Sequence, residues 1–156
     1  MRTTILLLAV LTLGLMAGLF YAYAGSVMPG LRRAGDRSSV EVMQRINEAI
    51  QNPLFGLIFG GALIFTGIAT FQNAGDPGVF WALLVALLLY AATLGVTAVV
   101  NIPLNNRLAR AGEPDALEDP AAVWAAFFPA WVRWNVLRTL TSVGAFAAGC
   151  WALLEY

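Results

Sequence analysis

Three asparagines and a proline stand together in VVNIPLNNRLAR, residues 99–110, directly after a long apolar run. A second segment, WVRWNVLR at residues 131–138, places Asn135 and Arg138 on nearly the same face of a helix. Amide side chains are costly in apolar surroundings unless they are hydrogen-bonded, so their convergence indicates a polar network or a polar ligand. An arginine flanked by amides could stabilise an oxyanion such as a phenolate or an enolate.

The sequence lacks the residues on which much enzyme chemistry depends. Histidine is absent, and Cys150 is the only cysteine. The usual zinc sites, most haem ligation and the Ser-His and Cys-His catalytic pairs are thereby excluded, so we expect no metal and no cofactor. The formal net charge is zero, which gives no support to nucleic-acid binding.

The composition is that of a membrane protein: 60% of the residues are hydrophobic, 12% are charged, and the mean hydropathy is +0.74. Four apolar stretches approach the roughly 20 helical residues that cross a hydrocarbon core. The expected fold is all-α, an integral membrane four-helix up-down bundle that forms a single domain over residues 1–156. The expected spans are about 3–25, 53–72, 78–100 and 131–155.

The N-terminal run also resembles a secretory signal, because Arg2 precedes it and Ala22-Tyr23-Ala24 has the form of a cleavage site. Its apolar core of about 20 residues is longer than the roughly 7 to 15 of a signal peptide. We therefore interpret it as a retained span.

The first connection contains SSVEVMQRINEAIQNP, in which apolar residues recur with a helical period. Ser38 and Glu41 have the spacing of a capping box, and Asn52 with Pro53 is typical of the start of the next span. The pattern predicts a short amphipathic helix at about 39–51 that lies along the membrane surface or over the bundle.

Eight of the nine basic residues, all of them arginines, fall in or beside the first and third connections. The positive-inside rule places these connections in the cytoplasm and both termini outside, and we expect a bacterial-type inner membrane. The two connections emerge on one side of an up-down bundle. The amphipathic helix, residues 101–110 and the start of the last helix are therefore expected to form a polar, aromatic-lined cap.

This cap supplies the candidate site. The candidate catalytic residues are Arg138, Asn101, Asn105 and Asn135, and the candidate substrate-binding residues are Trp131, Trp134, Asn47 and Met28. Structural explanations stay open: Asn101 could cap a helical turn before Pro103, and Arg138 could snorkel to the interface. The tryptophans could be membrane-anchoring belt residues.

The sequence resembles the anthrone oxygenase-like family of small four-helix membrane proteins in four segments: VMPGL at 27–31, MQRINEAIQNPLF at 43–55, NIPLNNRLA at 101–109 and WVRWNVLR at 131–138. The resemblance covers nearly the whole chain in the expected order. It implies a four-helix membrane fold. It also implies oxidation of anthrones to anthraquinones without an added cofactor, as in fungal members, whereas most bacterial members have no assigned reaction.

Such chemistry has definite requirements. An anthrone has an acidic carbon whose anion reacts with dioxygen, so the protein must supply a base, an oxyanion partner and a dry aromatic pocket. In the absence of histidine, the candidate bases are Glu48, Glu41 and Tyr23.

Two classes of function remain. One is a cofactor-independent oxygenase acting on a hydrophobic polycyclic or quinone-type small molecule, and the other is a non-catalytic protein that binds lipid or a partner helix through its cap. A substrate-sized cavity between the spans would favour the first, and a cap packed solid with hydrogen-bonded side chains the second. Small residues four apart, such as Gly14 and Gly18, fit packing inside the bundle better than a homo-oligomer, which stays an alternative.

Overall fold

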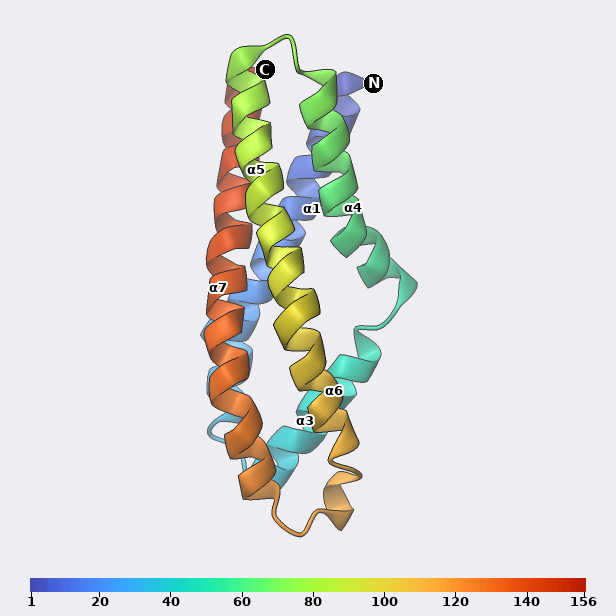
Figure 1. Cartoon of the computed structure of the whole chain (residues 1–156), viewed down its shortest axis with the longest axis vertical. Helices are drawn as coiled ribbons and strands as arrows, with labels where there is room; N and C mark the ends of the chain where they lie inside the picture. Colours follow the sequence, from blue (N-terminus) through green and yellow to red (C-terminus); the bar gives the residue numbers. More distant parts are fainter.

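The computed structural model describes residues 1–156 and contains helices but no strands. Its helices are α1 (Arg2–Ala22), α2 (Met28–Leu31), α3 (Asp36–Ala49), α4 (Pro53–Gln72), α5 (Pro77–Val96), α6 (Ile102–Arg110) and α7 (Pro120–Glu155). Figure 1 shows a long bundle with both termini and the α4–α5 turn at one end, and with α3 and α6 at the other.

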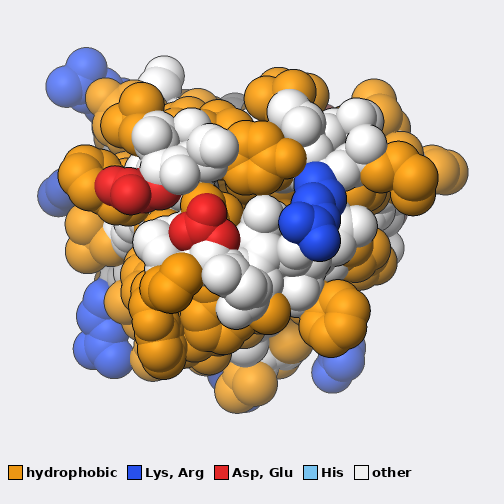
Figure 2. Space-filling model, turned by 90° about the horizontal axis from the view of Figure 1, so that it is seen from above, with side chains coloured by type: hydrophobic (Ala, Val, Ile, Leu, Met, Phe, Trp, Pro, Cys, Tyr) orange, Lys and Arg blue, Asp and Glu red, His pale blue; other side chains and the backbone are white.

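Four helical segments are long and apolar enough to cross a membrane: Arg2–Leu31, Pro53–Gln72, Pro77–Arg110 and Pro120–Glu155. The expected all-α membrane bundle is confirmed. Many large apolar side chains on the outer faces of these segments are exposed, as lipid-facing residues are. Figure 2 shows the end that carries the termini, where a few charged side chains lie among polar atoms in a surround of hydrophobic side chains.

Three helices begin in the same way, with an Asn or Asp cap followed by proline. The pairs are Asn52-Pro53, Asp76-Pro77 and Asp119-Pro120, and the cap oxygens accept backbone hydrogen bonds of 2.9, 3.4 and 2.9 Å. The capping box expected at Ser38 and Glu41 is wrong, because α3 already begins at Asp36 with Gly35 as an N-cap that makes no side-chain bond.

Two spans contain a π-helical turn, at Tyr23–Val27 between α1 and α2 and at Thr97–Asn101 between α5 and α6. The amides of Met28 and Ile102 donate to carbonyls five residues back, and a proline follows each of them, Pro29 and Pro103. Proline lacks an amide hydrogen and crowds the preceding turn, and a local π turn accommodates it. The helices therefore continue past these prolines, to Leu31 and Arg110.

The cap rests on its own hydrophobic cluster, separate from the two clusters inside the bundle. Its buried members are Met28, Leu31, Val40, Met43, Leu108, Trp124, Phe127 and Trp131. Only Val40 and Met43 come from α3, and both lie in its first eight residues. The part of α3 after Met43 contributes no residue to this cluster and lines a cavity instead.

Candidate functional site

A cavity of about 510 Å³ lies in the cap and is lined from α1, α3, α4, α6 and α7. Its size falls within the roughly 300–1,000 Å³ of small-molecule sites. Its aromatic lining residues are Phe20, Tyr23, Phe55, Phe59 and Trp131, and its polar ones include Gln44, Asn47, Asn105, Asn106 and Arg138. The cavity therefore combines flat aromatic walls with polar and charged groups, and 9 of its 20 lining residues are hydrophobic.

Arg138 is the buried one of the two arginines that line this cavity, the other being Arg45, and only 6% of the Arg138 surface is exposed. Its Nη2 donates to Oδ1 of Asn135 at 2.9 Å, and its Nη1 donates to Oγ1 of Thr97 at 3.4 Å. Its Nε has no hydrogen-bond partner in the protein. Because it is buried, Arg138 does not snorkel to water.

Two aromatic rings flank the guanidinium. Its Cζ lies 4.6 Å from the ring centre of Phe20 and 5.2 Å from that of Trp131. Cation–π contacts of this kind hold a guanidinium in a low-dielectric setting, and more strongly than they do at an exposed site. They fix its position without neutralising its charge.

No acidic side chain balances Arg138. The one ion pair in the protein joins Nη1 of Arg45 to Oε2 of Glu48 at 3.3 Å, with both side chains more than 60% exposed. A buried charge is costly unless it is paired, and an ionisable residue inside a membrane bundle generally marks a functional site. The site therefore offers a positive charge that an anionic ligand can pair with.

Two of the predicted amide residues belong to the network around Arg138. Asn135 accepts from Arg138 and donates from Nδ2 to the carbonyl oxygen of Phe20 at 3.2 Å. Asn105 lines the cavity, and its Oδ1 accepts from Nε1 of Trp131 at 2.8 Å. The structure thus brings Asn135 directly to Arg138 and links Asn105 to it through Trp131. The catalytic role of the two asparagines and the substrate-binding role of Trp131 stay predictions.

Two other predicted residues have unpartnered amides. Asn47 lines the cavity from α3, and its buried Nδ2 has no hydrogen-bond partner. Asn101 is 1% exposed, does not line the cavity, and has no partner for Oδ1 or for Nδ2. The interpretation of Asn101 as a cap is wrong, because it lies inside a continuous helix and makes no capping bond.

The last two predicted residues do not line the cavity. Met28 is buried in the hydrophobic cluster of the cap, together with Trp131. Trp134 is half-buried, and the guanidinium of Arg133 lies 5.4 Å from its ring centre. Neither side chain is on the wall that a ligand would contact.

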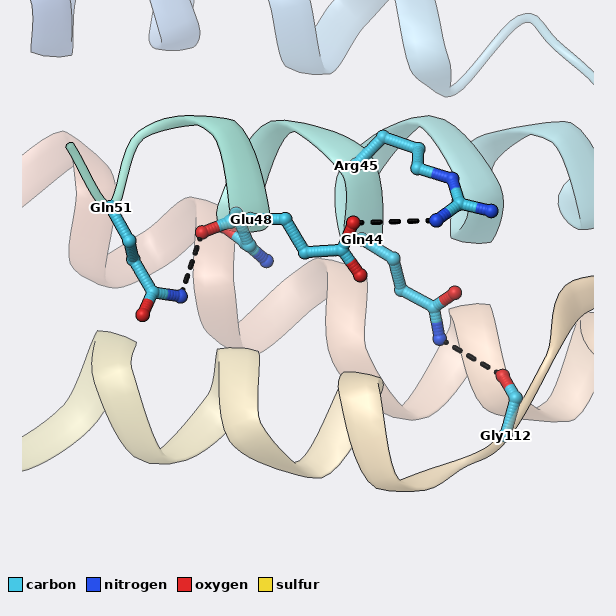
Figure 3. Close-up of polar contacts among 6 residues, drawn as sticks. Gln44, Arg45, Glu48, Gln51 and Gly112 are labelled. Carbon is cyan, nitrogen blue, oxygen red and sulfur yellow. Dashed lines mark hydrogen bonds and ion pairs between the residues drawn. The ribbon is translucent and has the colours of Figure 1, made fainter.

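The exposed residues that line the cavity all lie on α3 and α6 or just after them, so the cavity opens between these helices. Figure 3 shows Gln44 projecting from α3 toward the end of α6, where its Nε2 donates to the carbonyl oxygen of Gly112 at 3.2 Å, while Glu48 extends along α3 to Arg45. A second bond from Gln44 reaches the carbonyl oxygen of Leu108 at 2.9 Å. Of the candidate bases, Glu48 and Tyr23 line the cavity, whereas Glu41 does not.

Sequence reasoning missed several lining residues. Phe20, Phe55 and Phe59 lie in continuous apolar runs, where nothing marks one phenylalanine as facing a cavity. Thr97 had a usable signal, because it is four residues before Asn101 and therefore shares its helical face. The pattern of Asn101 and Pro103 left a capped helical turn as one interpretation, whereas the structure has a π turn there.

A known family profile covers most of the chain. The profile of a family described as anthrone oxygenase matches residues 41–148. The matched part contains Arg138, Asn135, Thr97, Asn105 and Glu48, and it excludes the α1 residues that complete the cavity. No curated protein and no solved structure is significantly similar to the chain.

Proposed function

Since the chain belongs to the anthrone oxygenase family, we propose that it is a membrane enzyme that oxidises a flat, hydrophobic molecule of the polycyclic or quinone type, using dioxygen and no cofactor. One observation carries the proposal: the buried guanidinium of Arg138 faces a substrate-sized cavity and has no carboxylate partner. A ligand oxyanion would supply the missing charge through charge-assisted hydrogen bonds.

The aromatic residues that line the cavity indicate the class of substrate. Phe20, Tyr23 and Trp131 surround the inner end of the cavity, and Phe55 and Phe59 lie along α4. Aromatic side chains favour flat aromatic ligands through offset and edge-to-face contacts. An enolisable aromatic ketone fits best, because it is neutral and membrane-soluble before reaction and anionic during it.

The reaction converts a methylene carbon between two aromatic rings to a carbonyl, so that CH₂ and O₂ give C=O and H₂O. A base removes one proton from the methylene carbon. The negative charge spreads to the ketone oxygen across the central ring, where Arg138 stabilises it. The anion gives one electron to dioxygen, and the resulting radical and superoxide combine to a peroxide, which is protonated. Loss of the second carbon proton and cleavage of the O–O bond then release water.

Geometry suggests which groups handle the protons. In an anthrone the acidic carbon lies across the central ring from the oxygen, so the base must lie across the cavity from the oxyanion partner. Glu48 lines the cavity from α3 and Arg138 from α7, which suits Glu48 as the base. The ring centres of Tyr23 and Trp131 are 5.5 Å apart, and Trp131 in turn lies beside Arg138. The hydroxyl of Tyr23 therefore suits hydrogen-bond donation to the oxyanion.

We place the cap on the cytoplasmic side of a bacterial-type inner membrane, in contact with lipid, because the arginines gather there. The cavity supports an enzyme over a protein that binds a partner helix. A binding cap would be packed solid, whereas Asn47 and Asn101 retain unpartnered amides.

Turnover by the purified protein tests the proposal. Anthrone is added to the protein in detergent under air, and anthraquinone formation and oxygen uptake are followed together. We expect equal amounts of quinone formed and oxygen consumed, at a rate well above that in empty micelles, which corrects for spontaneous oxidation. Arg138→Met should fall to the micelle rate, while Arg133→Met, on the exposed side of α7, should not. Equal rates for the wild type and empty micelles would refute the activity.

A further inference from the structure

Asn101 has the least satisfied side chain in the protein. It is 1% exposed, and neither its amide nitrogen nor its amide oxygen has a hydrogen-bond partner. An unmet buried polar group costs about 1–3 kcal/mol, and native proteins contain few of them. A leucine at this position would avoid that cost, so the amide itself requires an explanation.

From the register of two helices we infer that Asn101 lies near Arg138. Thr97 contacts Arg138, and Asn105 contacts Trp131. Asn101 lies midway between Thr97 and Asn105 on the same helical face, and α5–α6 runs antiparallel to α7. Asn101 therefore faces the stretch of α7 between Trp131 and Arg138. The unpartnered Nε of Arg138 lies at the upper end of that stretch.

We propose that Asn101 and Nε of Arg138 form an inner subsite, behind the cavity wall, for one oxygen atom that carries a proton. Asn101 offers a donor and an acceptor, and Nε offers a further donor. An oxygen that both accepts and donates hydrogen bonds satisfies this set, whereas a carboxylate or an ether, which only accepts, leaves Oδ1 of Asn101 unmet.

Such an oxygen can come from two sources. A buried water molecule typically makes about three hydrogen bonds to otherwise unmet polar groups, which matches the three atoms available. A hydroxyl group of an organic ligand held at Arg138 has the same chemistry. For the second source the inference rests on the proposed function, since it needs a ligand in the cavity.

Asn101→Leu separates the sources, with Asn73→Leu as the control. Asn73 is also buried, but its Nδ2 already bonds to the carbonyl oxygen of Ala69 within its own helix. Melting is measured without ligand, and binding of 2-(hydroxymethyl)anthraquinone, which has a free hydroxyl, is compared with that of 2-methylanthraquinone. A water site predicts that Asn101→Leu melts about 3 °C or more below the control. A ligand-hydroxyl site predicts melting at or above that of the control, because leucine removes an amide that is unmet without ligand, together with loss of a preference of about fivefold for the hydroxymethyl compound.

Either result supports the subsite. It is overturned if Asn101→Leu melts at or above the control temperature and the preference between the two quinones is unchanged or absent in the wild type. Should the leucine variant not fold, Asn101→Val, which adds less volume, is read by the same two measurements. Neither measurement involves turnover, so failure of the proposed oxidation leaves this test intact.

Discussion

The guanidinium carbon of Arg138 lies 4.6 Å from the ring centre of Phe20, so α7 meets α1 through a cation on an aromatic face. Asn135 reinforces the same junction by donating to the carbonyl oxygen of Phe20. The positive charge is thus held in place by two aromatic rings, a hydroxyl and an amide, none of which is an anion. This arrangement leads to the predictions that follow.

Arg138→Lys should destabilise the protein although it keeps the charge. Lysine has a compact ammonium group that cannot bond to Thr97 and Asn135 while lying flat between Phe20 and Trp131. We expect a loss of about 1–3 kcal/mol in the free energy of unfolding, measured by thermal melting in detergent. Arg133→Lys, on the exposed face beside Trp134, is the control and should be nearly neutral. Indistinguishable melting of the Arg138→Lys variant and the wild type would contradict the buried network.

Thr97→Asp should supply the missing counter-ion from within the protein. Oγ1 of Thr97 is 3.4 Å from Nη1 of Arg138, so a carboxylate at this position can pair with the guanidinium. We expect the variant to bind aromatic anions at least about tenfold more weakly than the wild type while it stays folded. Thr97→Asn, which is uncharged and of similar size, should retain most of the binding. Equal anion affinity in the aspartate variant would show that ligands do not use this charge.

Glu48→Gln should impair proton removal without impairing binding. General base catalysis typically contributes about 10²–10⁴ in rate, so turnover of an anthrone should fall by at least about 10²-fold at unchanged ligand affinity. Glu41→Gln, also on α3 but off the cavity wall, is the matched control. If Glu48→Gln turns over at the wild-type rate, another group is the base, and Tyr23→Phe becomes the variant to measure.

The membrane topology predicts opposite labelling of two loops. In a Cys150→Ala background, a cysteine at Asp115 should react with a membrane-impermeant reagent only when the cytoplasmic side is accessible, and one at Gly75 only from outside. Labelling of both from the same side would contradict the up-down arrangement. Labelling of each from the side opposite to the expected one would preserve the fold and reverse the orientation.

The sequence predicts the bundle well because its strongest signal, apolar length, is local. Hydrocarbon thickness sets a span of roughly 20 residues, and each span contains such a run. The polar cap could also be predicted from a local pattern, because Asn135 and Arg138 are a few residues apart and share a helical face. Of the residues that hold Arg138, Thr97 could have been found from the helical face that it shares with Asn101, whereas Phe20 could not, because it is distant in sequence and lies in an apolar run with no polar pattern.

The prolines show where local rules fail. Asn101, two residues before Pro103, has the pattern of a cap, and in isolation proline would end the helix there. Within the bundle a π turn absorbs the proline and keeps Asn101 inside a continuous helix, which carries it into the protein interior. Only packing against α7 decides between these outcomes, and that information lies outside any short window of sequence.

The central claim is that Arg138 holds an anionic oxygen of a flat ligand, and equilibrium binding of one probe pair tests it most directly. Anthracene-9-carboxylate is a stable, fluorescent, flat anion, and its methyl ester has the same rings without the charge. The wild type should bind the anion at least about tenfold more tightly than the ester, a difference of roughly 1.4 kcal/mol. Arg138→Met should bind both equally, while Arg133→Met keeps the preference. Equal affinity of the wild type for the two probes, or a preference that survives in Arg138→Met, would contradict the claim.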